Sequence, residues 1–251
     1  MTAGSVSADN DCAAADETAS ATVLTPESLQ NGSLPNWALP IEYLPASGRP
    51  DQLMVLLHGW ASDAQAMQPL AQALRERWPQ AAVLVPQANE PADAGRRGMQ
   101  WYSIEGLHVD GLWAARVAAM VVQLQTWVQA QQRRLGLAAS ATTLAGFSQG
   151  AILSLALALH DHAICARVLS FGGCLVKPPD AAPPQTHFHL FHGSDDRRIP
   201  AQRSSQAQQW LCALGAAVTL DLADGIGHLL HPTMIGQALQ RLDAQSASLS
   251  R

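Results

Sequence analysis

The chain has 251 residues, of which 48% are hydrophobic and 14% are charged. This balance is typical of a protein with a large buried core, and the length is compatible with one α/β domain. The net charge of −5 provides no basic footprint, so we expect no nucleic acid partner and no attraction to anionic lipid.

The first part of the chain differs from the rest. Its residues are small and acidic, with neither the basic nor the apolar segment of an export signal. We expect residues 1–36 to be a disordered or weakly ordered tail and residues 37–251 to form one domain. No apolar run approaches the roughly 18 residues of a membrane-spanning helix. The four cysteines lack the spacing of a metal site or a disulfide framework. Together with the absence of an export signal and of a long apolar run, this predicts a cytoplasmic protein without a membrane span.

In the first half of the domain, short apolar runs alternate with longer amphipathic segments. A buried strand is predicted at residues 53–57, and a helix at 64–78, where apolar residues recur at helical spacing. A second strand at 82–85 is followed by a loop rich in proline, glycine and arginine over about 86–100. A long helix is then expected from 111 to about 135.

The same alternation continues in the second half. Residues 142–147 predict a strand, and 151–159 predict a helix that is apolar nearly all round and therefore buried. Strand followed by helix, repeated this often, predicts a mostly parallel sheet with helices on both faces. The remaining strands are expected at 167–171, 187–191 and 217–222, and the remaining helices at 201–214 and 233–244.

A G-x-S-x-G sequence, Gly146 to Gly150, lies between the predicted strand at 142–147 and the helix after it. In such a motif the serine occupies a tight, strained turn that lifts its hydroxyl clear of the sheet, and the glycines remove Cβ atoms that would collide. The start of the helix also favours negative charge. Ser148 is therefore the candidate nucleophile, whereas Cys174 is expected to pack.

An activated serine needs a base, and His228 is the candidate. It follows the last predicted strand in a glycine-rich loop, at the edge of the sheet where open α/β proteins bind ligands. His231 is the alternative, although it precedes Pro232 at the expected start of a helix. A triad order with the serine first and the histidine last favours His228.

The base in turn needs an orienting carboxylate, which fixes its tautomer and stabilises the imidazolium. The stretch after the predicted strand at 187–191 contains two adjacent candidates, Asp195 and Asp196. Asp224, shortly before the histidine, is a third. The residues alone leave this choice open.

Several segments together resemble the phospholipase/carboxylesterase family of the α/β-hydrolase superfamily, which includes acyl-protein thioesterases. LLHGWASD resembles the family's LHGxGD segment, with Ala61 where glycine is usual, and GFSQG matches its nucleophile elbow. FHGSDDRRIP resembles HGxxDxxVP, and DGIGH resembles GxGH. GMQWYSIEGL is similar to a region of a bacterial esterase subgroup. The resemblance runs from about residue 50 to about residue 245.

The resemblance implies a single-domain α/β-hydrolase fold, hydrolysis of esters or thioesters, and no cofactor or metal. It assigns the acid to Asp196 and the base to His228. It also implies that the backbone N–H groups of Trp60 and Gln149 form the oxyanion hole, which stabilises the negative oxygen of the tetrahedral intermediate.

The connection between the strands at 167–171 and 187–191 is too short for a large helical lid. We therefore expect an open cleft for short- to medium-chain acyl esters or thioesters, with Trp60, Trp101 and Tyr102 as its candidate lining. The alternatives are an acyl-protein thioesterase or lysophospholipase, and a non-catalytic sensor that retains a hydrolase pocket. The serine in the elbow excludes a cysteine-nucleophile hydrolase. The sequence leaves a homodimer open.

Overall fold

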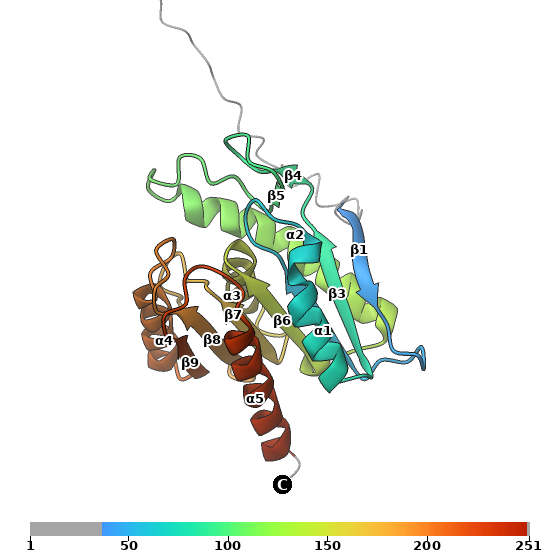
Figure 1. Ribbon diagram of the computed structural model, residues 1–251. Helices are drawn as coiled ribbons and strands as arrows, with labels where there is room; N and C mark the ends of the chain where they lie inside the picture. Colours follow the sequence, from blue (N-terminus) through green and yellow to red (C-terminus); the bar gives the residue numbers. More distant parts are fainter. Residues whose placement is uncertain (1–36, 250–251) are drawn as a thin grey trace, which may run out of the picture. The chain divides into compact units, whose positions relative to one another are not determined.

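The computed structural model describes residues 37–249, which form an α/β unit around a seven-stranded sheet (Figure 1). The strand order is β1-β3-β2-β6-β7-β8-β9. β1 (Ala38–Tyr43) pairs antiparallel with β3 (Ala81–Gln87), whereas the other neighbouring strands of this sheet are parallel. The mostly parallel sheet is confirmed. The expectation of a tail over 1–36 lies outside the described residues.

All the predicted strands are present, whereas β1 was not expected. β1 contains Pro40, which cannot donate a ladder hydrogen bond but is tolerated because β1 is an edge strand whose register with β3 shifts between Ala38 and Ile41. A second, two-stranded sheet pairs β4 (Glu90–Pro91) with β5 (Met99–Gln100), inside the segment expected to be a loop. The remaining strands are β2 (Gln52–Leu57), β6 (Thr142–Phe147), β7 (Arg167–Phe171), β8 (His187–Gly193) and β9 (Ala217–Ala223).

The predicted helices are also present, with one change at the first. A 3-10 turn at Ala64–Met67 precedes α1 (Gln68–Arg77), in whose first turn a proline is tolerated because its missing N–H has no partner there. No helix within residues 37–249 is long and apolar enough to cross a membrane. The other helices are α2 (Leu112–Leu135), α3 (Gln149–His160), α4 (Gln202–Ala213) and α5 (Pro232–Leu249), with a 3-10 turn at Ala139–Ala141.

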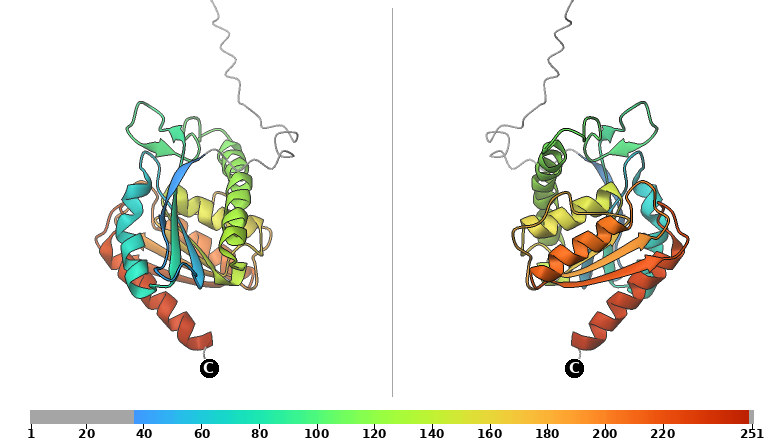
Figure 2. Two further views of the ribbon diagram at one scale, coloured as in Figure 1. Left: turned by 90° about the vertical axis from the view of Figure 1, so that its right-hand side faces the viewer. Right: turned by 90° about the vertical axis from the view of Figure 1, so that its left-hand side faces the viewer.

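Helices cover both faces of the sheet, as predicted. α1 and α5 lie on one face and α2, α3 and α4 on the other (Figure 2). Side chains of β2 alternate between these two layers because successive residues of a strand point to opposite faces. Leu53, Val55 and Leu57 pack with α2 and α3, whereas Met54 and Leu56 pack with α1 and α5.

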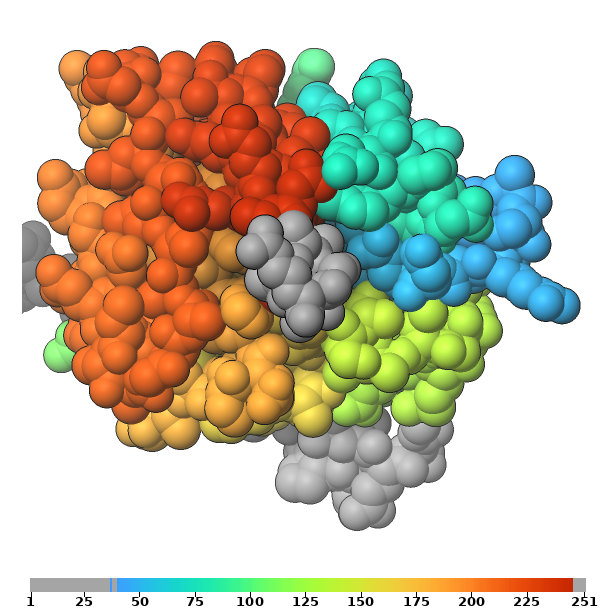
Figure 3. Space-filling view, turned by 90° about the horizontal axis from the view of Figure 1, so that it is seen from below, coloured from blue at the N-terminus to red at the C-terminus, as the bar shows by residue number. Residues whose placement is uncertain are grey.

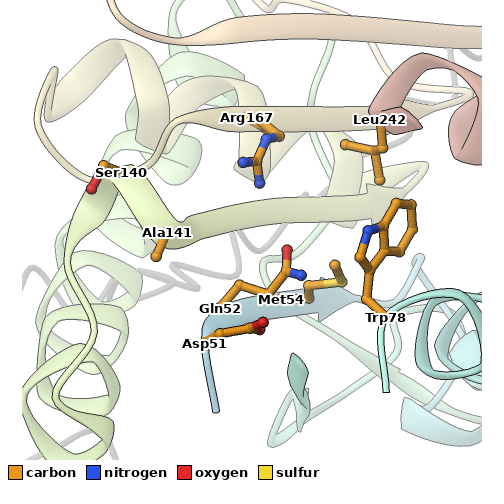
Figure 4. Close-up of a pocket in the computed structure, with 8 residues that line it drawn as sticks. All are labelled: Asp51, Gln52, Met54, Trp78, Ser140, Ala141, Arg167 and Leu242. Carbon is orange, nitrogen blue, oxygen red and sulfur yellow. The ribbon is translucent and has the colours of Figure 1, made fainter. Parts of the chain in front are cut away.

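The amino-terminal ends of the parallel strands lie at the end of the molecule seen in Figure 3. A cavity of about 340 Å³ opens here between the starts of β2, β6 and β7, and Arg167 and Trp78 lie on two of its sides (Figure 4). No histidine or cysteine is found among the described residues that line it. None of the predicted site residues lines this cavity. They lie at the opposite edge of the sheet.

Candidate active site

Ser148 occupies a sharp turn between the end of β6 and the start of α3. Its backbone has φ +54° and ψ −114°, a conformation that side chains rarely adopt, and its N–H donates to Phe171 O at 2.9 Å. Such strain costs about 1–3 kcal/mol and is typical of functional sites. The flanking glycines are required by space, because a Cβ at Gly150 would overlap Leu57 O and one at Gly146 would overlap the backbone of Gly150.

The structure brings the three predicted side chains together at the carboxyl edge of the sheet. His228 lies in the loop between β9 and α5, and its Nε2 is 2.8 Å from Ser148 Oγ. Its Nδ1 is 2.6 Å from Oδ2 of Asp196, which lies in the turn after β8. The Phe147 ring packs against the imidazole, with ring centroids 4.9 Å apart. The resulting chain of hydrogen bonds runs from a carboxylate through an imidazole to a hydroxyl.

Asp196 is held as a carboxylate. Its side chain is 1% exposed, and its Oδ1 accepts hydrogen bonds from the N–H groups of Arg198 and Ile199, each at 2.9 Å. Burial by itself would raise the pKa of Asp196, but hydrogen bonds from His228 and from these two N–H groups outweigh it, so the pKa lies below its ordinary value. An ionised Asp196 accepts from His228 Nδ1–H, which leaves the Nε2 lone pair facing Ser148.

The alternative residues do not reach Ser148. Asp195 and Asp224 are exposed, and both carboxylates accept from the Ser194 hydroxyl, at 3.0 and 3.4 Å. His231 contacts its near neighbour Thr233 through Nδ1. The geometry therefore favours Asp196 and His228 over their rivals.

A cavity of about 550 Å³ opens beside Ser148 and His228. Trp60 and Gln149, whose backbone N–H groups are the expected oxyanion hole, both line it. Gln149 is the first residue of α3, where N–H groups lack acceptors within the helix and so are free to bind an anion. The loop before Trp60 lies against the elbow, because a Cβ at Gly59 would be only 3.4 Å from Ser148 Cβ.

Of the aromatic residues expected to line the cleft, Trp60 and Tyr102 do so, but Trp101 does not. The Trp101 side chain is in the core, 1% exposed, and its Nε1 donates to His58 O at 2.9 Å. Its ring packs edge-on against Trp37, with centroids 5.5 Å apart. Trp101 is therefore behind the cavity wall, and we correct its expected role to that of a supporting residue.

The side chain of Gln149 is a functional feature that sequence reasoning missed. Its Nε2 donates to Tyr102 O at 2.7 Å, and its Oε1 accepts from Trp101 N at 2.8 Å. The residue after the nucleophile therefore fixes the loop that forms one wall of the cavity. The only signal for it in the sequence is the GFSQG motif, which contains Gln149 but does not indicate what its side chain contacts.

His192, the histidine of the FHGSDDRRIP segment, is a second residue that contacts the candidate site and to which the sequence analysis assigned no role. It is fully buried at the end of β8, and its Nε2 lies 2.7 Å from Ile199 O and 3.2 Å from Oδ2 of Asp196. Its Nδ1 is 2.6 Å from Ser204 Oγ. Burial lowers the pKa of His192, so it is neutral, and a proton on Nε2 satisfies both Ile199 O and the carboxylate. Two histidines therefore contact one carboxylate oxygen of Asp196.

Comparison with known proteins gives these residues a family context. The model of the phospholipase/carboxylesterase family matches residues 43–246. The chain belongs to this family. As a member, the protein is an α/β-hydrolase of the esterase and thioesterase class, as the resemblance implied.

Relatives of this hydrolase include proteins with named activities. It is 33% identical to esterase YpfH of Escherichia coli (strain K12) over 191 residues, which cover 76% of this chain and 82% of that one. It is 27% identical to acyl-protein thioesterase 1 of Gibberella zeae over 192 residues, covering 70% and 79%. The crystal structure of esterase PE8 superposes with a TM-score of 0.75 at 26% identity, covering 82% of this chain and 98% of that one.

Proposed function

We propose that this hydrolase cleaves short- to medium-chain carboxylic esters or thioesters, with Ser148 as nucleophile, His228 as base and Asp196 as the orienting acid. The observation that carries the proposal is the continuous hydrogen-bonded chain, at 2.8 and 2.6 Å, on the wall of a cavity. These distances fall within the range that proton transfer requires.

In the first step His228 Nε2 takes the proton of Ser148 as its Oγ attacks the carbonyl carbon. The carbonyl oxygen becomes negative and accepts hydrogen bonds from the N–H groups of Trp60 and Gln149, and each such donor is worth about 2.7–4 kcal/mol. The imidazolium then protonates the departing alcohol or thiol, which leaves an acyl group on Ser148.

In the second step water replaces the leaving group. His228 takes a proton from that water, hydroxide adds to the acyl carbon, and the acid is released as Ser148 recovers its proton. Asp196 remains ionised throughout and stabilises the imidazolium. The same groups serve esters and thioesters, since both reactions pass through an oxyanion.

The walls of the cavity limit the size of the acyl group that can bind. Residues 172–186, all of them described, contain no helix that could cover the site between β7 and β8. Tyr102 and Trp113, joined by a hydrogen bond of 3.2 Å, provide an aromatic wall, and Ile152 forms part of the inner end. Such a pocket suits a short apolar acyl group.

The test compares Ser148→Ala with the matched variant Ser140→Ala, which alters an exposed serine at the opposite end of the sheet. With p-nitrophenyl acetate and butyrate as substrates, we expect Ser148→Ala to lower kcat by at least about 10³-fold and Ser140→Ala to have little effect. A fluorophosphonate probe should label the wild type and not Ser148→Ala. Turnover of Ser148→Ala within tenfold of wild type would refute the proposed nucleophile, and a wild type that neither turns over nor labels would favour the sensor.

An acyl-protein thioesterase, whose substrate is an acylated protein, is the second candidate and is favoured by the likeness to acyl-protein thioesterase 1. Matched pairs of substrates decide between the two, each pair carrying the same acyl group on p-nitrophenol and on an acylated cysteine peptide. A kcat/KM that is consistently higher for the peptide thioester across the pairs would establish the thioesterase.

A further inference from the structure

A second cavity, of about 360 Å³, has Ile152 in common with the cavity that contains Ser148. It is formed by α2, α3 and the segment after β7, and it belongs to no part of the proposed mechanism. Its inner part is apolar, with Val117, Val121 and Leu175 beside Ile152. Its outer part carries polar residues, among them Lys177.

Ile152 lines both cavities. It lies one helical turn after Ser148, and its N–H donates to Ser148 O at 3.0 Å. The residue as a whole is only 3% exposed. Ile152 therefore borders both a space that opens on the nucleophile and a space whose buried lining is hydrocarbon.

The neighbouring part of the partition is held by polar contacts. Trp113 donates to Tyr102 Oη at 3.2 Å, and the Arg203 guanidinium lies over the Trp113 ring at 5.8 Å. Arg203 also donates to Leu175 O at 3.0 Å. Ile152, in contrast, has a hydrocarbon side chain that contributes only packing contacts. We expect its removal to open the partition without breaking any of these hydrogen bonds.

We propose that Ile152 determines the acyl-chain length of the substrate, and that the second cavity is a closed-off extension of the acyl site that would take a longer hydrocarbon tail. The inference rests on the proposed function. The occupant is the tail of an ester whose carbonyl is at Ser148, because the cavities share a wall and the inner lining of the second is apolar. In the wild type the Ile152 side chain blocks this path, so long chains are poor substrates.

The experiment measures kcat/KM for p-nitrophenyl acetate, butyrate, octanoate and decanoate. We expect Ile152→Ala to raise the ratio of decanoate to acetate by at least about tenfold, since one methylene in an apolar pocket is worth roughly 10- to 200-fold in discrimination. Ile152→Val removes a single methyl group and should shift the ratio in the same direction by less. It also provides a milder variant should Ile152→Ala fold poorly.

A second substitution tests the path of the tail. Ala156 lies one turn further along α3 and lines the second cavity but not the first. Ala156→Phe would place a large aromatic side chain in the second cavity and narrow it, and in combination with Ile152→Ala it should bring the ratio back toward the wild-type value. A ratio that stays high in the double variant would show that the tail leaves by another route and would overturn the proposal.

The outcomes separate this inference from the proposed function. If both Ile152 variants leave the ratio unchanged while acetate is cleaved and the fluorophosphonate probe labels Ser148, the proposed function stands and the role of Ile152 is refuted. If the wild type neither cleaves acetate nor labels, the proposed function itself fails.

Discussion

Replacing Asp196 by asparagine tests the proposed triad, because the hydrogen bonds around Asp196 determine which way the asparagine amide would face. Oδ1 of Asp196 accepts from the N–H groups of Arg198 and Ile199, whereas Oδ2 accepts from His228 Nδ1. An asparagine has one oxygen and one NH₂ group at these positions. The two backbone donors will select the oxygen, so the NH₂ group must face His228.

His228 would then have to accept at Nδ1, and its proton would move to Nε2, which faces Ser148. A histidine in that tautomer cannot take the proton of Ser148. The same change in a serine protease triad lowers kcat by about 10⁴-fold, which corresponds to about 5 kcal/mol of activation free energy. We expect a loss of this size for Asp196→Asn, measured as kcat on p-nitrophenyl butyrate.

The matched control is Asp195→Asn, because Asp195 is the adjacent aspartate but is exposed and directed to Ser194. It should retain nearly wild-type kcat, and urea denaturation of both variants would establish that each is folded. If folded Asp196→Asn kept kcat within tenfold of wild type, the assigned tautomer and the role of Asp196 would both be refuted. A large loss of kcat in Asp195→Asn would instead identify Asp195 as the acid that orients His228.

Three further changes test the positions of the loops and the effect of burial. In Gly193→Ala the new Cβ would collide with backbone oxygens of the loop that carries His228, so we expect kcat on p-nitrophenyl butyrate to fall by about 10²-fold. The control is Gly227→Ala, whose Cβ would meet open space, and it should retain the wild-type kcat on the same substrate. His231 precedes α5 and accepts a hydrogen bond from Thr233 N–H, as a helix cap does. His231→Ala should therefore keep kcat but lower the free energy of unfolding, measured in urea, by about 1 kcal/mol. A large loss of kcat would instead identify His231 as the base. Burial lowers the pKa of His189 from 6.5 to about 4, so as the pH falls the unfolded chain takes up this proton before the folded chain does. The free energy of unfolding should therefore decrease between pH 6.5 and pH 4. His189→Asn should make that decrease smaller.

The central strands of the sheet could be located from sequence because helices cover both faces, so β2, β3 and β6 are nearly continuous buried runs. β9, at the edge, is only partly buried and contains Thr219 and Asp221. β1 could not be located in this way. Its place depends on antiparallel pairing with β3, a contact between distant parts of the chain, and Pro40 weakens its local signal. The helix expected at 64–78 begins as a 3-10 turn, a distinction that apolar spacing does not make.

Ser148 could be found from its sequence context, because strand, glycines and helix are all local features. The choice between Asp195 and Asp196 could not be made from the residues, since adjacent side chains diverge according to the turn that carries them. In the structure Asp195 N–H bonds to Ile226 O, which ties the turn after β8 to the loop before His228. Trp101 was misplaced for a related reason, because an aromatic residue in a loop gives no sign of which way it points.

Close contact between backbones explains why the candidate triad is well defined although its residues come from three separate loops. A Cβ at Gly150 would collide with Leu57 O, and a Cβ at Gly193 would collide with Ile226 O. The elbow therefore rests directly on the end of β2, and the turn after β8 rests on the loop that carries His228. Catalytic groups must be held to within about 0.5 Å, and backbone contacts of this kind contribute to that precision together with the side-chain contacts of Gln149 and His192. We therefore expect that a cavity side chain such as Ile152 can be replaced without moving Ser148.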